Sequence, residues 1–171
     1  MDLDARFRQT HRTGCLEAVG FRSAQEGDAN GIASVLQNLF DAGKRSKSCT
    51  AEFVLGHYIS HPDSIRCTVA VERDGRILGF QSLRHAVANN PYDVTVGWGI
   101  IGTHIRPAAA RRGIGRGLFA QTRDAARAFG LSFIDATIGA ENTEGLAYYE
   151  AMGFRAYRQP EDAVSKVYQL Q

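Results

Sequence analysis

The sequence has few cysteines and no long apolar run. Cys15, Cys49 and Cys67 are odd in number and widely spaced, which argues against a disulfide framework or a zinc site. No apolar run approaches the roughly 18 residues of a membrane span, and residues 1–12 lack the apolar core of a signal peptide. These absences argue against a secreted scaffold and a membrane protein, and they predict a cytoplasmic chain with reduced thiols and no metal.

Excess charge of either sign is also missing. The 171 residues carry 20 Lys and Arg against 18 Asp and Glu, a formal net charge of +2. This balance gives no global attraction to nucleic acid or to a membrane, and neither is expected as a partner. The length favours one domain with a sizeable core, which we place at residues 18–171. Residues 1–17 mix charges with few apolar residues and are expected to form a flexible arm.

Acidic residues are absent from Val94 to Arg123, and this stretch holds the most informative pattern in the chain. A strand-like segment ending at Ile105 leads through a glycine-rich turn into a helix-patterned segment, Ile114–Phe129. Glycine lets the backbone turn sharply and approach a ligand, and the first turn of a helix presents unpaired N–H groups to anions. The glycines and arginines of the turn are Arg106, Arg111, Arg112, Gly113, Gly115, Arg116 and Gly117. Together they predict a phosphate-binding cradle.

The spacing excludes two common phosphate sites. A P-loop needs Lys-Ser or Lys-Thr after its glycines, but Arg116-Gly117-Leu118 stands there. A dinucleotide-binding turn needs a third glycine where this chain has Leu118. The literal Gly-x-Gly-x-x-Gly pattern occurs at 97–102, but a Pro107 turn follows it instead of a helix, so we interpret that copy as strand.

The rest of the chain shows alternating strand and helix patterns without repeats or linkers. Strands are predicted at 18–24, 66–72, 76–83, 94–105, 133–138, 154–157 and 164–170, with Asp74-Gly75 as a hairpin turn. Helices are predicted from Asp28 to near Gly43, around Phe53–Ile59, at Ile114–Phe129 and at Thr143–Met152. The third helix should bury Leu118, Phe119, Thr122, Ala125, Ala126 and Phe129.

These motifs resemble those of the GNAT superfamily of acyl-CoA-dependent N-acyltransferases. The family's strand-Val-x-Pro entry matches Ile105-Arg106-Pro107, and its Gly-x-Gly turn falls six residues later, at Gly113 and Gly115. A second segment, Asn142-x-x-Gly-Leu-x-x-Tyr149-Glu-x-x-Gly153-Phe154, looks like the family's Asn…Tyr-Glu-x-x-Gly-Phe signature. One position departs from the family pattern: Ala110 stands where Gln or Arg is usual, which leaves the positive charge to Arg111 and Arg112.

The resemblance implies an α/β (α+β) fold of three layers, in which about four helices flank a mixed, splayed sheet of six to seven strands. It also implies acetyl-CoA as co-substrate, with pantetheine between the strand ending at Ile105 and the strand at 133–138. The first two helices would frame the acceptor. The residues expected to contact acetyl-CoA are Thr103, Ile105, Arg111, Arg112, Gly113, Ile114, Gly115, Arg116, Gly117, Asn142 and Tyr149.

Acyl transfer from a thioester to an amine needs a polarised carbonyl, a neutral amine and a proton for the departing thiolate. The N–H of Ile105 is the candidate for polarising the carbonyl, a contact worth roughly 10²–10³ in rate. The family's signature tyrosine corresponds to Tyr149, which we assign as general acid, with its neighbour Tyr148 as packing. Asn142 is either an N-cap, a pantetheine contact or both. The candidate bases are Asp135, Glu141, His85 and His104, for each of which a structural role is favoured.

The predicted function is direct acetyl transfer in a ternary complex, since no cysteine lies in the predicted site segments. A small primary amine such as an amino acid, a polyamine or an aminoglycoside-like compound is the expected acceptor. The alternatives are a peptide or protein acceptor (an N-terminus or a lysine) and a CoA-binding sensor without catalysis. An extended groove would favour peptide, whereas a closed cup with a charged wall would favour a metabolite. A homodimer is left open.

Overall fold

A computed structural model describes residues 18–47 and 49–171, so the predicted N-terminal arm and Cys15 lie outside the described residues. Within these ranges the chain forms a mixed seven-stranded sheet in the order β1-β2-β3-β4-β5-β7-β6. The strands are β1 (Gly20–Ser23), β2 (Ser64–Val71), β3 (Ile77–His85), β4 (Gly99–Ile105), β5 (Phe133–Gly139), β6 (Arg155–Arg158) and β7 (Ala163–Gln169). Neighbouring strands are antiparallel except for β4 and β5, which are parallel. The predicted fold class is confirmed.

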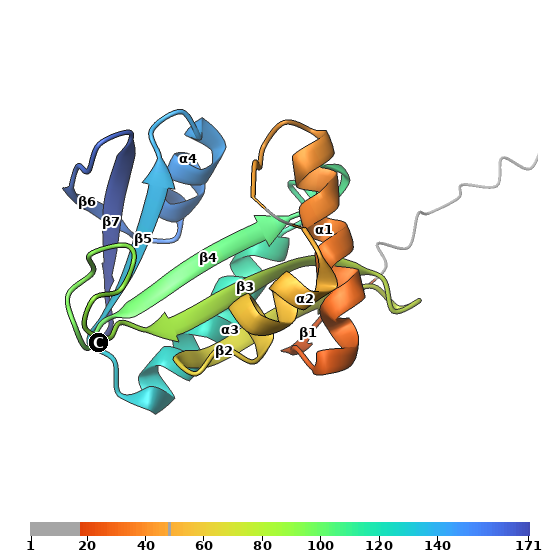
Figure 1. The fold of residues 1–171 in the computed structure, drawn as a ribbon, viewed down its shortest axis with the longest axis horizontal. Coiled ribbons are helices and arrows are strands. Elements are labelled where there is room, and N and C mark those ends of the chain that lie inside the picture. The colour runs from red at the N-terminus through yellow and green to blue at the C-terminus, as the bar shows by residue number, and fades with distance from the viewer. Residues whose placement is uncertain (1–17, 48) are drawn as a thin grey trace, which may run out of the picture.

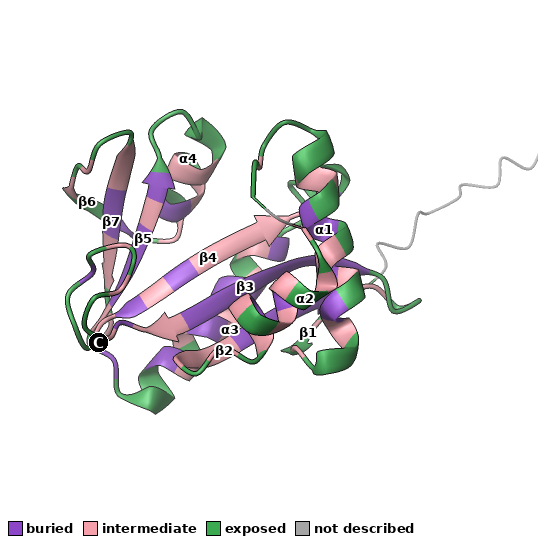
Figure 2. Cartoon of the chain, viewed as in Figure 1, coloured by how far each residue is buried: buried purple, intermediate pink, exposed green. Residues whose placement is uncertain are grey.

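Helices cover both faces of the sheet (Figure 1). They are α1 (Ala29–Asp41), α2 (Ala51–Val54) with its π-helical continuation η2 (Leu55–Ile59), α3 (Ile114–Phe129) and α4 (Thr143–Ala151), with short 3₁₀ turns η1 (Glu26–Asp28) and η3 (Pro107–Ala109). Helices α1 and α2 lie on one face and α3 lies behind the sheet, on the other (Figure 1). Side chains along β3 point alternately to the two faces of the sheet. Phe80 packs with α1 and α2, whereas Leu83 packs with α3 and α4. β3 is therefore buried along most of its length (Figure 2).

The helix α3 has the predicted bounds because its ends have strong local signals. Gly113 precedes it in the left-handed conformation (φ 75°), and Gly130 ends it at φ 89°. Leu118, Phe119, Thr122 and Ala126 are buried as predicted. Phe129 differs from the prediction: it is 53% exposed at the last turn of the helix, where its ring lies against His85 at 5.3 Å between centroids.

The strand predicted at 94–105 is shorter than expected, because β4 begins only at Gly99. Asp93 and Gly97 have positive φ angles of 52° and 92°, which extended strands do not adopt. The Trp98 amide donates to the Thr95 carbonyl and closes a turn. The two valines in this segment therefore belong to a loop, in which Val94 is buried and Val96 is exposed.

Candidate active site

The strands β4 and β5 start side by side and then separate (Figure 1). Their parallel pairing is limited to Gly99 with Ile134 and Ile100 with Asp135. On its other side, β4 stays paired with β3 over its full length, and the Arg106 amide extends the ladder to the Leu78 carbonyl at 2.8 Å. Because hydrogen-bonded and non-hydrogen-bonded pairs alternate in an antiparallel ladder, the N–H groups of Thr103 and Ile105 point away from β3 and into the gap.

Two tyrosines of α4 reach the β4 side of this gap. The hydroxyl of Tyr149 lies 2.8 Å from Oγ1 of Thr103, and Nε2 of Gln81 donates to the same Thr103 oxygen at 2.7 Å. The hydroxyl of Tyr148 donates to the Gly115 carbonyl at 2.8 Å and accepts from Gln81 at 3.1 Å. Tyr148 therefore does more than pack: its hydroxyl connects α4 to the first turn of α3. Burial raises the pKa of Tyr149 above its ordinary value and that of Tyr148 to about 12, so both phenols are protonated at neutral pH.

Gln81 also lies at the gap, where the sequence did not predict it. It is fully buried, and its Oε1 atom has no hydrogen-bond partner among the described residues. A signal was present, because Gln81 and Ser82 interrupt the otherwise apolar Ile77–Leu83 segment. A buried amide in a strand is costly unless it is hydrogen-bonded, so its position between Thr103 and Tyr148 marks the gap as a polar site.

The turn before α3 has the features that a diphosphate requires. Gly113 occupies the N-cap position and has no side chain that could cap the helix, so the first N–H groups of the helix find no side-chain acceptor at the N-cap residue. Space around Gly113 is open, whereas a Cβ on Gly115 would meet the Tyr148 ring at 2.5 Å. Gly117 differs from the prediction, because its amide already donates to the Gly113 carbonyl and its missing Cβ makes room for the Phe21 ring. The amides that remain for a ligand are those of Gly113, Ile114, Gly115 and Arg116.

The arginines around the turn divide into three groups. Arg111 and Arg116 are exposed beside the helix terminus, with Arg111 in the left-handed region at φ 63°. Arg112 forms an ion pair with Glu72 at 2.9 Å, a carboxylate that the β2–β3 hairpin brings to the turn. Arg106 does not surround the turn as predicted. It is buried and donates to the Ile77 carbonyl at 2.7 Å, with further bonds to Asn38 (2.6 Å) and Ser34 (3.0 Å) in α1.

The structure also places Asn142, which was predicted to begin α4, and the candidate general bases. Asn142 is an N-cap, since its Oδ1 accepts from the Gly145 amide at 2.9 Å. Asp135 is fully buried and accepts from Tyr157 (2.8 Å) and Thr137 (2.9 Å), while burial raises its pKa. His85 pairs with Gly99 at the opposite end of β4 from Thr103, and Glu141 is exposed in the loop before α4.

His104 faces the α1–α2 side, as its alternation with Thr103 predicts. Its ring stacks on Phe80 at 4.8 Å between centroids, and its Nε2 lies 3.4 Å from the Tyr58 hydroxyl. Burial is the main reason that its pKa is lowered to about 3, with Arg45 as the next cause. The imidazole is therefore neutral at pH 7.

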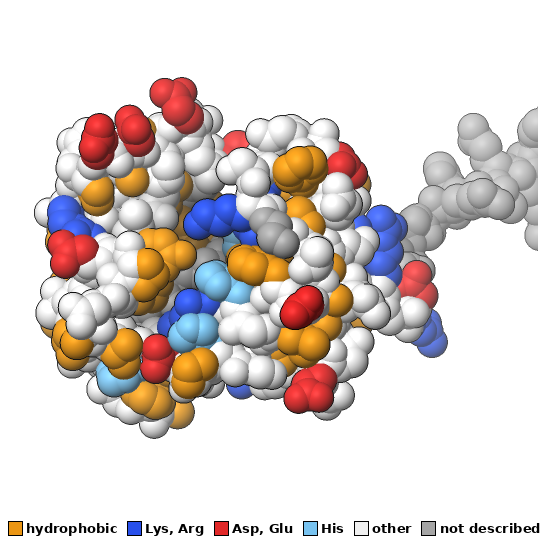
Figure 3. Space-filling view, in the orientation of Figure 1, with side chains coloured by type: hydrophobic (Ala, Val, Ile, Leu, Met, Phe, Trp, Pro, Cys, Tyr) orange, Lys and Arg blue, Asp and Glu red, His pale blue; other side chains and the backbone are white. Residues whose placement is uncertain are grey.

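A basic cavity of about 210 Å³ lies on the α1–α2 face, where β4 and β5 diverge. Its lining residues are Arg45, Lys47, His57, Tyr58, Ser82, Arg84, Tyr92, Ile100, Ile101, Gly102, His104 and Thr137. Lys, Arg and His side chains gather in the hollow between the α1–α2 part and the α4 part of the molecule (Figure 3). The sequence shows the basic loop at 44–47 but gives no sign that Arg84 joins it.

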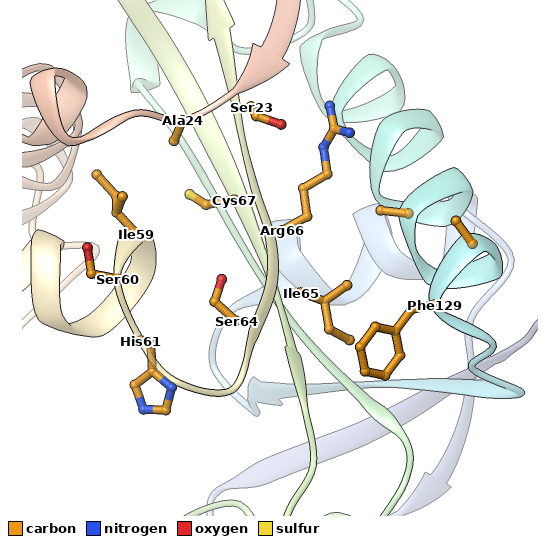
Figure 4. Close-up of a pocket in the computed structure, with 12 residues that line it drawn as sticks. Ser23, Ala24, Ile59, Ser60, His61, Ser64, Ile65, Arg66, Cys67 and Phe129 are labelled. Carbon is orange, nitrogen blue, oxygen red and sulfur yellow. The ribbon is translucent and has the colours of Figure 1, made fainter.

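A larger hollow of about 700 Å³ lies at the edge of β2, away from these residues (Figure 4). None of the predicted site residues lines it. Cys67 does, and burial raises the pKa of its thiol to about 12, which makes it a poor nucleophile. Residues 18–47 and 49–171 contain no group of three or more His, Cys, Asp or Glu that could hold a metal ion. In the same ranges, no helix has both the length and the apolar character needed to cross a membrane.

The fold is one that solved structures share. A GCN5-related N-acetyltransferase from Kribbella flavida superposes with a TM-score of 0.74 at 24% identity, covering 90% of this chain and 98% of that one. A phosphinothricin acetyltransferase from Sinorhizobium meliloti, solved with AcCoA, gives 0.72 at 18% identity, with 89% and 88% covered. The PaiA N-acetyltransferase from Thermoplasma acidophilum, solved with coenzyme A, gives 0.71 at 15%, with 89% and 99% covered. These similarities show a common fold.

The family follows from the sequence itself. The model of the acetyltransferase (GNAT) family matches residues 32–154, which include the turn before α3 and the α4 signature. No curated protein matches the chain. The chain belongs to the GNAT family and is an acyl-CoA-dependent N-acyltransferase, as its motifs predict.

Proposed function

We propose that the protein transfers an acetyl group from acetyl-CoA directly to the primary amine of a small molecule. The observation that carries this proposal is the gap between β4 and β5, which has a phosphate-type turn at one end and a small basic cavity on the α1–α2 face. Thr103 and Tyr149 lie between these two features. Donor and acceptor would thus meet at the gap from opposite faces of the sheet.

The donor, acetyl-CoA, fits the turn on grounds of charge and backbone geometry. The uncapped amides from Gly113 to Arg116 and the exposed Arg111 and Arg116 would hold its diphosphate. Pantetheine would then follow the free edge of β4, where the N–H groups of Thr103 and Ile105 point. Asn142 lies at the start of α4, where its side-chain amide would contact the same arm while its oxygen caps the helix. Arg112 would add positive charge, reduced by its pair with Glu72.

In the reaction, the neutral amine nitrogen attacks the thioester carbon, so that a C–N bond forms and the C–S bond breaks. The N–H of Ile105 would stabilise the negative charge on the carbonyl oxygen, and Tyr149 would give its hydroxyl proton to the departing thiolate. The excess proton of the amine leaves through water. The cavity is lined by neither Cys49 nor Cys67, which supports direct transfer without an acyl-enzyme.

The shape of the cavity supports a metabolite in preference to a peptide. Its volume of about 210 Å³ is below the range of roughly 300–1,000 Å³ that is usual for drug-sized ligands. Its wall is charged, whereas an extended peptide would need a groove with backbone hydrogen-bonding groups along it.

Acetyl-CoA turnover on an amine panel tests the proposal. Purified protein is mixed with acetyl-CoA and with amino acids, polyamines, aminoglycosides and tripeptides, and free CoA and acetylated products are measured. We expect a small amine to be acetylated, and no acetylated protein on rapid quenching. CoA binding without release across the panel would identify a sensor, and preference for tripeptides would identify a peptide acetyltransferase.

A further inference from the structure

We infer that the acceptor carries an anionic carboxylate or a similar oxoacid group beside its amine, and that Arg84, with Lys47 and Arg45, binds this group. The inference deepens the proposed function and rests on it for the position of the amine. Its basis is the basic cavity, which lies on the opposite face of the sheet from α3 and so does not belong to the phosphate turn.

Arg84 is held in the cavity by the fold. It stands near the end of β3, on the same face as Ser82 and Phe80, and its guanidinium donates to the backbone carbonyl of His57 in η2. That carbonyl is one of the last in the helix, where a cation is favourable. A guanidinium has five N–H donors in a planar fork, and a carboxylate accepts two of them in parallel. Arg84 is therefore a fixed group with donor capacity for an oxoacid.

The other two cations come from the basic loop before α2. Arg45 lies over the Phe53 ring at 5.8 Å, and Lys47 is exposed at the cavity rim. Both line the same cavity as Arg84 although they are far from it in sequence. A cluster drawn from β3 and a separate loop is a product of the tertiary structure and is hard to explain as a simple solvated face.

Among the described residues, none of those that line this cavity is Asp or Glu. The carboxylate whose charge reaches Arg84 is Asp63, which is outside the lining and lies 3.9 Å from His61. Burial, together with the charges of Arg84, His61, Lys47 and Arg45, lowers the pKa of His57 to about 4. The field in the cavity is therefore positive, and the neutral imidazoles do not offset it.

This field decides which amines can enter. A polyamine or an aminoglycoside brings further positive charge and is repelled, whereas an amino acid brings a carboxylate that pairs with Arg84. The same cations lower the pKa of a nearby ammonium, so the field also helps to supply the neutral amine that attack requires. The cavity is small, which favours an anion and an amine separated by a few bonds.

Matched acceptors test the inference with the full-length protein. Amino acids are compared with their amides, with the decarboxylated amines and with aminoalkyl phosphonates of equal chain length, using kcat/KM. We expect the acids or the phosphonates to exceed the amides and simple amines by about tenfold or more, as loss of a charged hydrogen-bond pair would predict. Equal or higher kcat/KM for the uncharged analogues or for polyamines would overturn the inference.

Two variants separate a specific contact from a general effect. Arg84→Gln should raise KM for the anionic acceptors by roughly tenfold to a hundredfold and leave that for the amides and for acetyl-CoA nearly unchanged. Arg127→Gln, an equal change of charge on the exposed side of α3, should leave all of them unchanged. An equal loss for anionic and uncharged acceptors in Arg84→Gln would contradict the inference.

A binding arm distinguishes failure of the inference from failure of the proposed function. N-acetyl amino acids and their amides are titrated by calorimetry into the CoA-loaded protein and into Arg84→Gln. Preferential, Arg84-dependent binding of the acids supports the anion site even if no amine is acetylated, in which case the proposed transferase activity alone has failed. Equal binding of acids and amides, or no binding of either, rejects the anion site.

Discussion

The Tyr149 hydroxyl lies 2.8 Å from Oγ1 of Thr103, so a side chain of α4 reaches the free edge of β4. The strand that follows α3, β5, has by then separated from β4. The contact therefore places a phenol at the β4 side of the gap, beside the N–H groups that point into it. Burial keeps this phenol protonated at neutral pH, which is the state that a proton donor requires.

Tyr149→Phe should lower kcat by about a hundredfold, the lower part of the range for general acid–base catalysis. The KM for acetyl-CoA should change little, because the ring keeps its packing against Phe154. Tyr148→Phe is the matched control: it loses the bond to the Gly115 carbonyl and should raise the acetyl-CoA KM more than it lowers kcat. Steady-state kinetics separate the two. Unchanged turnover in Tyr149→Phe would reject its role as acid.

Gly115→Ala and Gly117→Ala should have different effects although both glycines lie in the first turn of α3. A Cβ on Gly115 meets the Tyr148 ring at the proposed diphosphate site, so acetyl-CoA affinity should fall by about tenfold or more, or roughly 1.4 kcal/mol. A Cβ on Gly117 meets the Phe21 ring of β1, so stability should fall by about 1–3 kcal/mol through overpacking. Calorimetric titration with CoA measures the affinity, and thermal unfolding measures the stability. Equal loss of CoA affinity in two stable variants would contradict this division.

Arg116→Gln should weaken acetyl-CoA binding and reduce its dependence on salt, because an exposed cation beside the helix terminus attracts phosphate through a screened interaction. Arg106→Gln should instead lower Tm, since the buried guanidinium joins α1 to the start of β3. Titrations at two ionic strengths, with thermal scans of both variants, test this. A lower salt dependence in Arg106→Gln would place that arginine at the phosphate after all.

Acid should destabilise the fold through His57 and His104. In the unfolded chain these imidazoles take up protons below about pH 6.5. In the fold, their lowered pKa values of about 4 and about 3 keep them neutral. Between about pH 6.5 and the lowered pKa values, the unfolded chain therefore binds more protons than the folded protein. The contribution of the neutral imidazoles to the free energy of unfolding is complete above about pH 6.5 and is lost as the pH falls. His104→Leu should reduce the fall in Tm between pH 7 and pH 4.5. An unchanged slope would show that His104 does not titrate differently on unfolding.

Sequence patterns were most informative where a local signal sets the structure. The bounds of α3 follow from glycines with positive φ at both ends, and the hairpin at Gly75 follows from the same conformational freedom. The predicted start of β4 was wrong. Valines at 94 and 96 are typical of a strand, but they also fit a loop that buries one of the two side chains. Arg106 was placed at the phosphate turn because sequence proximity does not show side-chain direction. The assignments of acetyl-CoA contacts and of Tyr149 stay predictions.

The sequence by itself determined the family and the turn before α3, because backbone conformation and helix-end charge depend on a few neighbouring residues. Only the tertiary structure decided that Glu72 meets Arg112 and that Arg84 joins the loop at 44–47 in one cavity. The β2–β3 hairpin brings Glu72 to Arg112, and the packing of α2 and η2 against β3 brings the loop before α2 to Arg84. Electrostatic interaction depends on distance in space and on burial, neither of which is set by position along the chain.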